Sequence, residues 1–191
     1  ADYIHIPSDF GASIGRYANR IAQGRIVLDG DTIQLPQNNF GHCLHGGPQG
    51  WQYKVYEANP IDDTTLELTL HSPDGDENFP GNVTATVTYK LTDDNAIDIK
   101  YSATTDKKTV INMTNHSYFN LSGNPAHAAT DHLLYINADS YTPVDITFMT
   151  TDEIVTVKET PMDFTSPKTN GQDIANYYFL QLKSGNGYDH N

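Results

Sequence analysis

Histidines, amides and a tyrosine gather at two places in the sequence. The first is the glycine-rich run His42-Cys-Leu-His-Gly-Gly47, and the second is Asn115-His-Ser-Tyr-Phe-Asn120 at the end of a strand-like stretch. An imidazole titrates near neutral pH, so one histidine can donate a proton while another orients a reactant. General acid–base chemistry is therefore indicated. His45 and His116 are favoured for it, because glycine backbone or amide side chains bring donors close to each.

The stretch Asn112–Leu121 separates polar from apolar residues when it is read with the two-residue period of a strand. We expect its apolar face, made of Ile111, Met113, Phe119 and Leu121, to pack on a core. The other face carries only hydrogen-bonding side chains, namely Asn112, Thr114, His116, Tyr118 and Asn120. Such a row is not buried without partners, and a polyhydroxylated ligand would supply them.

Other chemistries find less support in the sequence. A metal cluster could be drawn from His42, His45, His116 and His190, but no pair has the spacing of a strong metal motif. Cys43 could act as a nucleophile, although a single cysteine is more often a small buried residue. Neither a Gly-x-Ser-x-Gly motif nor a strand–glycine loop–helix phosphate unit is present. We therefore favour a site without a metal.

Composition narrows the class of partner. The chain has 191 residues, with 24 acidic against 11 basic side chains and a net charge of −13. This charge argues against nucleic acid or an anionic membrane as partner and suits a neutral small molecule. Cys43 is the only cysteine, so an internal disulfide is excluded. No apolar run could span a bilayer and no signal-peptide pattern is present, which makes the cytoplasm the default location.

The elements that must position these residues alternate like strands. We expect strands over residues 25–28, 32–35, 51–58, 65–71, 82–91, 97–103, 108–121, 133–138, 140–144 and 153–157, with one helical turn over 173–177. A turn over 29–31 would join the first two. Since no stretch holds a sustained 3.6-residue period, we predict an all-β fold, a large antiparallel β-sandwich. We also predict a single domain over residues 1–191.

The segment 10–21 carries two arginines four residues apart, Arg16 and Arg20, which bracket Asn19. By itself this spacing favours a short helix with a solvated arginine pair. Gly11 and Gly15 in the same segment indicate a tight bend or a close approach of the backbone.

Six stretches resemble the aldose 1-epimerases, also called galactose mutarotases. They are Gly15–Ile21, Leu44–Gly47, Phe79–Gly81, Asn112–Leu121, Thr160–Phe164 and Gly187–Asn191. They follow the family's order and cover nearly the whole chain. The resemblance implies a β-sandwich of the galactose mutarotase type, a supersandwich, that binds a free sugar in an open cleft. It implies interconversion of the α and β anomers of an aldohexose such as galactose or glucose, without a metal or organic cofactor.

The resemblance also implies an acid–base pair. A base removes the proton of the C1 hydroxyl while an acid, here His116, protonates the ring oxygen; the ring opens, the C1–C2 bond rotates and the roles reverse on closure. His45 would hydrogen-bond the sugar near the ring oxygen. The family's base is a glutamate downstream of the Gly-Tyr-Asp-His motif, and no residue here maps onto it. We therefore expect a domain incomplete at both ends, which needs the remainder of its parent and has little activity alone.

Four further residues would surround the sugar if the resemblance holds. Arg20 and Asp189 would hold its hydroxyls, a task suited to charged groups. Asn19 and Tyr118 would line the cleft. A different class stays open, a carbohydrate-binding module with the same fold and no catalysis, because fold does not fix function. The negative charge disfavours phosphorylated sugars.

Overall fold

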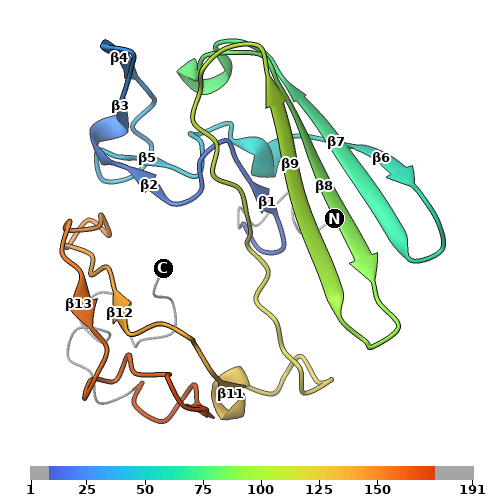
Figure 1. Cartoon of the computed structure of the whole chain (residues 1–191), viewed down its shortest axis with the longest axis vertical. Helices are drawn as coiled ribbons and strands as arrows, with labels where there is room; N and C mark the ends of the chain where they lie inside the picture. The colour runs from blue at the N-terminus through green and yellow to red at the C-terminus, as the bar shows by residue number, and fades with distance from the viewer. Residues whose placement is uncertain (1–8, 175–191) are drawn as a thin grey trace. The chain divides into compact units, whose positions relative to one another are not determined.

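A computed structural model describes residues 9–174 of the chain. Within that range the regular elements are β-strands and four short 3₁₀ helices (Figure 1). The predicted all-β class is therefore confirmed. The chain divides into two compact units, residues 1–117 and 118–191, and each is described by itself. The single domain over residues 1–191 stays a prediction. No helix in the described part is long and apolar enough to cross a membrane.

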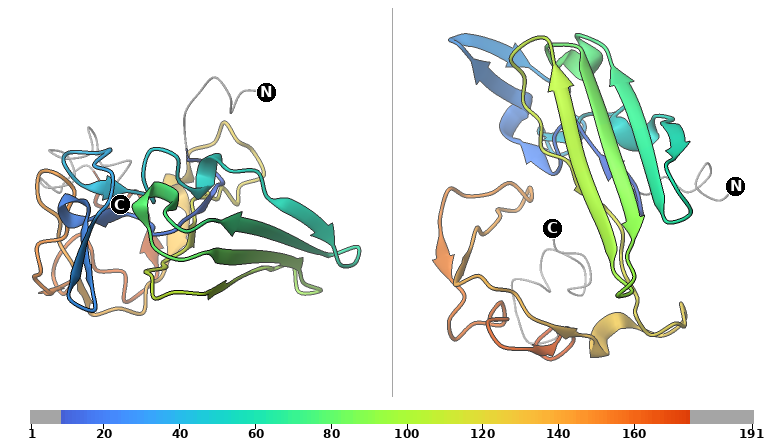
Figure 2. Two further views of the ribbon diagram at one scale, coloured as in Figure 1. Left: turned by 90° about the horizontal axis from the view of Figure 1, so that it is seen from above. Right: turned by 45° about the vertical axis from the view of Figure 1, so that its right-hand side comes forward.

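A four-stranded antiparallel sheet dominates the first unit, with the strands in the order β6–β7–β8–β9 (Figures 1 and 2). The strands are β6 (Glu57–Pro60), β7 (Thr65–Ser72), β8 (Val83–Leu91) and β9 (Ile97–Thr105). Their register places Leu68 beside Val87 and Val87 beside Tyr101. Apolar residues thus share one face of the sheet, as the period of a strand requires.

Strand β8 shows how far the alternation holds. Val83, Ala85 and Val87 are buried, as the two-residue period of a strand requires. Leu91 continues the same alternation, but it is 55% exposed. The apolar face of β8 is thus covered at its first half and open at its last residue.

Short strand pairs complete the first unit. The hairpin of β3 (Arg25–Leu28) and β4 (Asp31–Gln34) confirms the predicted turn, in which Asp29 and Gly30 have φ angles of 53° and 91°. Positive φ at both central residues matches the twist of a hairpin. Two further antiparallel pairs carry the site: β1 (Ser13–Ile14) with β10 (Thr114–Asn115), and β2 (Arg20–Ile21) with β5 (Cys43–Leu44). The 3₁₀ helix η1 (Ala22–Gly24) follows β2, and η3 (Asp76–Asn78) lies in the β7–β8 connection.

Two clusters of buried side chains form the core of this unit. One gathers Trp51, Leu70, Val83 and Ala85, with Met113 packed against it. The other gathers Leu35, Cys43 and Phe79. Burial raises the pKa of the Cys43 thiol to about 11, so this cysteine is a protonated core residue at neutral pH and a poor nucleophile.

Two predicted strands of the first unit were wrong in extent. Residues 51–58 form the 3₁₀ helix η2 (Trp51–Tyr53) and only then enter β6. The reason is tertiary: the Trp51 backbone N–H donates to the carbonyl of Gly15 at 3.0 Å instead of to a sheet neighbour. Residues 108–121 contribute only β10 to a strand pair.

The predicted apolar face of Asn112–Leu121 is also only partly correct. Met113 packs on the Trp51 cluster. Ile111 is 36% exposed, and Phe119 and Leu121, which belong to the second unit, are 60% and 83% exposed. The two-residue period therefore does not continue through the end of this stretch.

Strands in the second unit are shorter than predicted. They form two antiparallel pairs, β11 (Leu133–Leu134) with β14 (Lys168–Thr169), and β12 (Ser140–Tyr141) with β13 (Val155–Thr156), and η4 covers Ala129–Asp131. Side-chain hydrogen bonds to local backbone shape the connections, as where Asp145 accepts from the backbone of Thr147 and Met149. Such local bonds compete with strand ladders. The helical turn predicted over 173–177 lies mostly outside the described residues.

Candidate active site

His45 and His116 meet edge to face in the first unit. Their ring centroids are 5.3 Å apart and the ring planes are inclined by 89°. One follows β5 and the other follows β10, so tertiary structure joins residues that are far apart in the sequence. His45 is only 6% exposed, whereas His116 is half-buried. The pair predicted to carry the acid–base chemistry is therefore brought together.

Backbone contacts fix the position and tautomer of His45. The backbone N–H of Asn19 donates to His45 Nδ1 at 2.9 Å, and the backbone N–H of His45 donates to the carbonyl of Asn19 at 3.0 Å. A neutral imidazole with an accepting Nδ1 carries its proton on Nε2. His45 is therefore set up as a hydrogen-bond donor through Nε2.

Electrostatics keep that imidazole neutral. Burial lowers the pKa of His45 to about 4, and the nearby charges of His116 and Arg20 act in the same direction, while Asp9 opposes them. Loss of solvation disfavours the charged form of a histidine. At neutral pH the imidazole of His45 is therefore uncharged and carries a single N–H group, on Nε2.

Glycines let the loop that carries His45 lie directly on the segment before Arg16. Gly46 has a φ of +79°, and a Cβ there would lie 2.1 Å from the carbonyl oxygen of Gly15. A Cβ on Gly15 would in turn lie 2.0 Å from Cε3 of Trp51. Both positions require the close backbone approach that only glycine permits, as predicted for Gly15.

His116 is held by a neighbouring segment on both sides of its peptide. Its N–H donates to the carbonyl of Ala12 at 2.9 Å, and its carbonyl accepts from the N–H of Gly11 at 3.1 Å. The preceding side chain, Asn115 Nδ2, donates to the hydroxyl of Tyr89 on strand β8 at 3.1 Å. The large sheet thus anchors Asn115, the residue directly before His116.

Arg20 reaches the same region from β2, where it pairs with Leu44, the residue before His45. Its guanidinium donates to Asn39 Oδ1 from Nε at 3.1 Å and from Nη2 at 2.9 Å, and Nη1 donates to Asn19 Oδ1 at 3.3 Å. These hydrogen bonds go to neutral amide oxygens. Arg20, Asn19 and His45 therefore lie together, as predicted, and Asn39 is a contributor that sequence reasoning missed. Two adjacent asparagines so close to His42 were the available signal.

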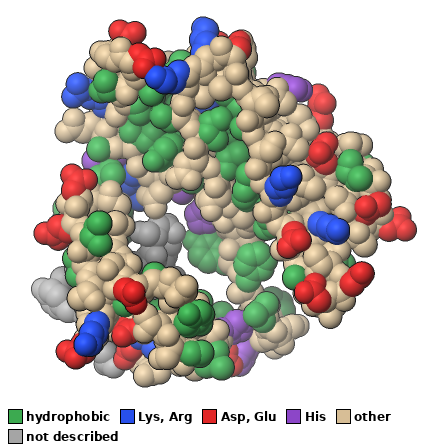
Figure 3. Space-filling view, viewed as in Figure 1, with side chains coloured by type: hydrophobic (Ala, Val, Ile, Leu, Met, Phe, Trp, Pro, Cys, Tyr) green, Lys and Arg blue, Asp and Glu red, His purple; other side chains and the backbone are tan. Residues whose placement is uncertain are grey.

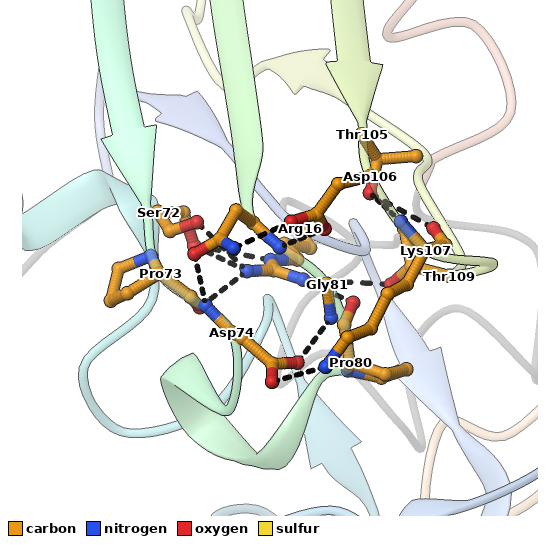
Figure 4. A network of polar contacts seen from close by, with 11 residues as sticks. Arg16, Ser72, Pro73, Asp74, Pro80, Gly81, Thr105, Asp106, Lys107 and Thr109 are labelled. Atoms are coloured by element: carbon orange, nitrogen blue, oxygen red, sulfur yellow. Dashed lines mark hydrogen bonds and ion pairs between the residues drawn. The ribbon is translucent and has the colours of Figure 1, made fainter.

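Arg16 corrects a prediction. The segment around it forms no helix, and Arg16 is 1% exposed instead of solvated. Its guanidinium donates to Ser72 and to the carbonyls of Pro73 and Pro80 (Figure 4). Four-residue spacing indicated a helix face, but these acceptors, distant in sequence, determine where the side chain lies. Sequence reasoning gave Arg16 no role.

Two of the predicted sugar-binding residues, Tyr118 and Asp189, do not belong to the first unit. Tyr118 belongs to the second unit and is 55% exposed. Asp189 and His190 lie outside the described residues. His42 Nδ1 accepts from the backbone N–H of Gln23 at 3.0 Å. Among residues 9–174 no group of three or more histidine, cysteine or acidic side chains could hold a metal ion.

Acidic side chains are spread over the face drawn in Figure 3 and are interspersed with basic ones. This distribution matches a net charge of −13. No large basic patch is visible on that face, which is the feature that binding of a polyanion would require.

Comparisons with known proteins define the family. A sequence model of the Aldose 1-epimerase family matches residues 1–191. The aldose 1-epimerase of Escherichia coli (strain K12) is 44% identical over 182 residues, which cover 94% of this chain and 51% of that protein. The galactose mutarotase of Sus scrofa is 38% identical over 190 residues, which cover 100% of this chain and 53% of the relative.

Solved structures agree with the sequence relatives. A galactose 1-epimerase from Lactobacillus acidophilus NCFM matches with a TM-score of 0.87 at 34% identity, over 99% of this chain and 56% of that chain. An aldose epimerase homologue from C. elegans matches with a TM-score of 0.82 at 32% identity, over 90% of this chain and 53% of that one. The chain therefore belongs to the aldose 1-epimerase family and has its all-β fold. It spans about half the length of the curated relatives that it matches.

Proposed function

We propose that the protein is an aldose 1-epimerase that interconverts the α and β anomers of free aldohexoses such as galactose and glucose. The observation that carries this proposal is the edge-to-face pair of His45 and His116, 5.3 Å apart. His45 is a fixed neutral donor, and we assign the proton transfer to His116. Ring opening of a sugar needs a proton donor at the ring oxygen and a base at the C1 hydroxyl. The histidine pair would supply the first of these, with His45 binding the ring oxygen and His116 protonating it.

In the proposed mechanism, His45 Nε2–H donates a hydrogen bond to the sugar near its ring oxygen and His116 delivers a proton to that oxygen. The C1 hydroxyl loses its proton to a base as the C1–O5 bond breaks, which leaves an open-chain aldehyde. Rotation about C1–C2 and reversal of both proton transfers give the other anomer. The base is the glutamate of the family pattern, onto which no residue of this sequence maps. No metal or organic cofactor enters the proposed steps.

Substrate hydroxyls would be held by Arg20, with Asn19 beside it. Asn39 supports the role of Arg20, because its amide oxygen accepts two N–H groups of the guanidinium and so orients it. A charged donor to a hydroxyl pair is stronger than a neutral one. Asp189 and Tyr118 complete the proposed set from the family pattern.

Polarimetry of freshly dissolved α-D-galactose tests the proposal on the longest form of the protein that its gene encodes. His116→Ala should lower kcat at least a hundredfold and change galactose affinity little, since a proton donor acts in the transition state. His71→Ala is the matched control, because His71 lies exposed on β7 and contacts Thr84. Galactose binding without acceleration of mutarotation in the wild type would favour a binding module and refute the enzyme.

A further inference from the structure

The buried guanidinium of Arg16 joins three parts of the first unit (Figure 4). Nε and Nη2 donate to Ser72 Oγ at 3.1 and 2.8 Å, and Nη2 also donates to the carbonyls of Ser72 and Pro73 at 3.2 and 2.9 Å. Nη1 donates to the carbonyl of Pro80 at 2.9 Å and to Thr109 Oγ1 at 3.5 Å. The end of β7, the β7–β8 connection and the segment after β9 thus share one cation.

Two aspartates, Asp76 and Asp74, act on this cation by their charge. Ser72 Oγ, which accepts from Arg16, donates to Asp76 Oδ2 at 2.7 Å. Asp74 accepts from Lys107 Nζ at 2.5 Å in the same network (Figure 4). Burial lowers the pKa of Arg16, while Asp76 and Asp74 oppose that shift, and a guanidinium stays charged at neutral pH. Removal of Arg16 would therefore leave buried carbonyls without their donor, which is costly.

The backbone of Arg16 leads directly to both histidines. Its carbonyl accepts from the N–H of Asn112 at 2.9 Å, and the carbonyl of Asn112 accepts from the N–H of Ala18 at 2.8 Å. Asn112 begins the stretch that carries His116. Next to Ala18, Asn19 exchanges two hydrogen bonds with His45. The segment 15–19 therefore holds His45 directly and binds the start of the stretch that carries His116.

We propose that Arg16 is a positioning residue for the histidine pair. Its side chain fixes the segment 15–19 to the large sheet, and that segment sets where His45 lies relative to His116. Arg16 acts through the backbone and does not touch the sugar. The consequence for catalysis rests on the proposed function, but the positioning itself does not.

Chemistry explains why the position needs an arginine. A guanidinium presents five N–H donors in a rigid plane and can serve several acceptors at once. A lysine has the same charge but a compact ammonium with three donors, so Arg16→Lys retains the charge and loses the geometry. Phe79 lies against the guanidinium, with its ring centroid 5.9 Å from Cζ, and this contact too favours a planar cation.

The experiment is an imidazole ¹H–¹⁵N titration of the 191-residue chain by NMR. In the wild type we expect His45 in the Nε2–H tautomer with a pKa of about 4. In Arg16→Lys and Arg16→Met the pKa of His45 should rise toward its ordinary value of 6.5, and the tautomer should become mixed. The matched control is Arg25→Met, because Arg25 is exposed on β3 and its guanidinium donates to the nearby Thr32. It should leave both signals unchanged.

A change in the position of His45 must be distinguished from unfolding of the variant chain. The imidazole of His71, which contacts Thr84 in the large sheet, should keep its wild-type signals in the Arg16 variants. If Arg16→Met does not fold, Ser72→Ala removes one acceptor of the guanidinium and should produce a smaller rise in the pKa of His45. A folded Arg16→Met or Ser72→Ala chain with an unchanged His45 tautomer and titration would overturn the proposal. This result is independent of galactose turnover, so it is distinguishable from failure of the proposed enzyme activity.

Discussion

Asn19 and His45 hold each other by a reciprocal pair of hydrogen bonds. The N–H of Asn19 donates to His45 Nδ1 at 2.9 Å, and the N–H of His45 donates to the carbonyl of Asn19 at 3.0 Å. Asn19 adopts a φ of 59° to make this contact, and His45 adopts one of 52°. Both residues therefore adopt the left-handed backbone region, which is unfavourable for non-glycine residues, and this conformation fixes one imidazole. The same pair of hydrogen bonds accompanies the positive φ angles and sets the tautomer of His45.

His45 should make stability depend on pH in a defined window. The unfolded chain binds a proton at His45 below pH 6.5, whereas in the folded chain its pKa is about 4. The contribution of neutral His45 to the free energy of unfolding is therefore fully present above pH 6.5 and is lost as the pH falls toward 4. At ~1.4 kcal/mol per pKa unit, the loss is about 3 kcal/mol. Urea unfolding at pH 7.0 and pH 4.2 measures the difference.

The variant His45→Gln provides the control for this window. It cannot titrate there, so its free energy of unfolding should fall less between the two pH values than that of the wild type. Aspartates such as Asp74 and Asp106, whose folded pKa is lowered from 3.8, lose their contribution below the window. Equal losses in the wild type and the variant would contradict a neutral buried His45.

Gly46→Ala should destabilise the first unit strongly. The new Cβ would lie 2.1 Å from the carbonyl oxygen of Gly15 at a φ of +79°. Left-handed strain and overpacking together suggest a loss of roughly 2–4 kcal/mol. Gly30→Ala separates the two causes, because its φ is +91° but nothing lies within 4 Å of its Cβ. Unfolding in guanidinium chloride should show a larger loss of stability for Gly46→Ala than for Gly30→Ala. Similar losses in the two variants would mean that the contact with the Gly15 carbonyl oxygen is not a cause.

Asn39→Ala should weaken sugar binding without unfolding the chain. It removes the amide oxygen that accepts two N–H groups of Arg20, so the guanidinium would lose its orientation. A loss of roughly tenfold in galactose affinity corresponds to about 1.4 kcal/mol. Calorimetric titration with galactose measures it, and Asn59→Ala on the exposed strand β6 is the control. If Asn39→Ala binds galactose like the control, Arg20 does not depend on Asn39.

The 191-residue chain alone should accelerate the mutarotation of α-D-galactose little. In the proposed mechanism His116 supplies the acid, but no residue of the sequence maps onto the glutamate proposed as the base. Loss of one partner of an acid–base pair typically costs about 10²–10⁴ in rate. Polarimetry of fresh α-D-galactose with and without the chain checks this expectation, and a rate near that of whole relatives would show that another group acts as base.

The sequence by itself determined the class of fold, the main strands and the identity of the histidine pair. Val83, Ala85 and Val87 alternate with threonines, and Asp29-Gly30 suits a hairpin turn. Both patterns depend only on residues that are close in the sequence, so they can be recognised without the tertiary structure. The family's motifs likewise survive as short strings, so His45, His116 and Arg20 could be named before their positions were known.

Only the tertiary structure decided what surrounds those residues. Arg16 looked like half of a solvated pair, yet it is buried because its acceptors, such as Ser72, lie 56 residues away. Asn39 matters because β2 and β5 bring its loop to Arg20, and His45 is neutral because burial and a backbone donor act on it together. Burial and long-range partners depend on which segments meet in space, and no local period encodes that.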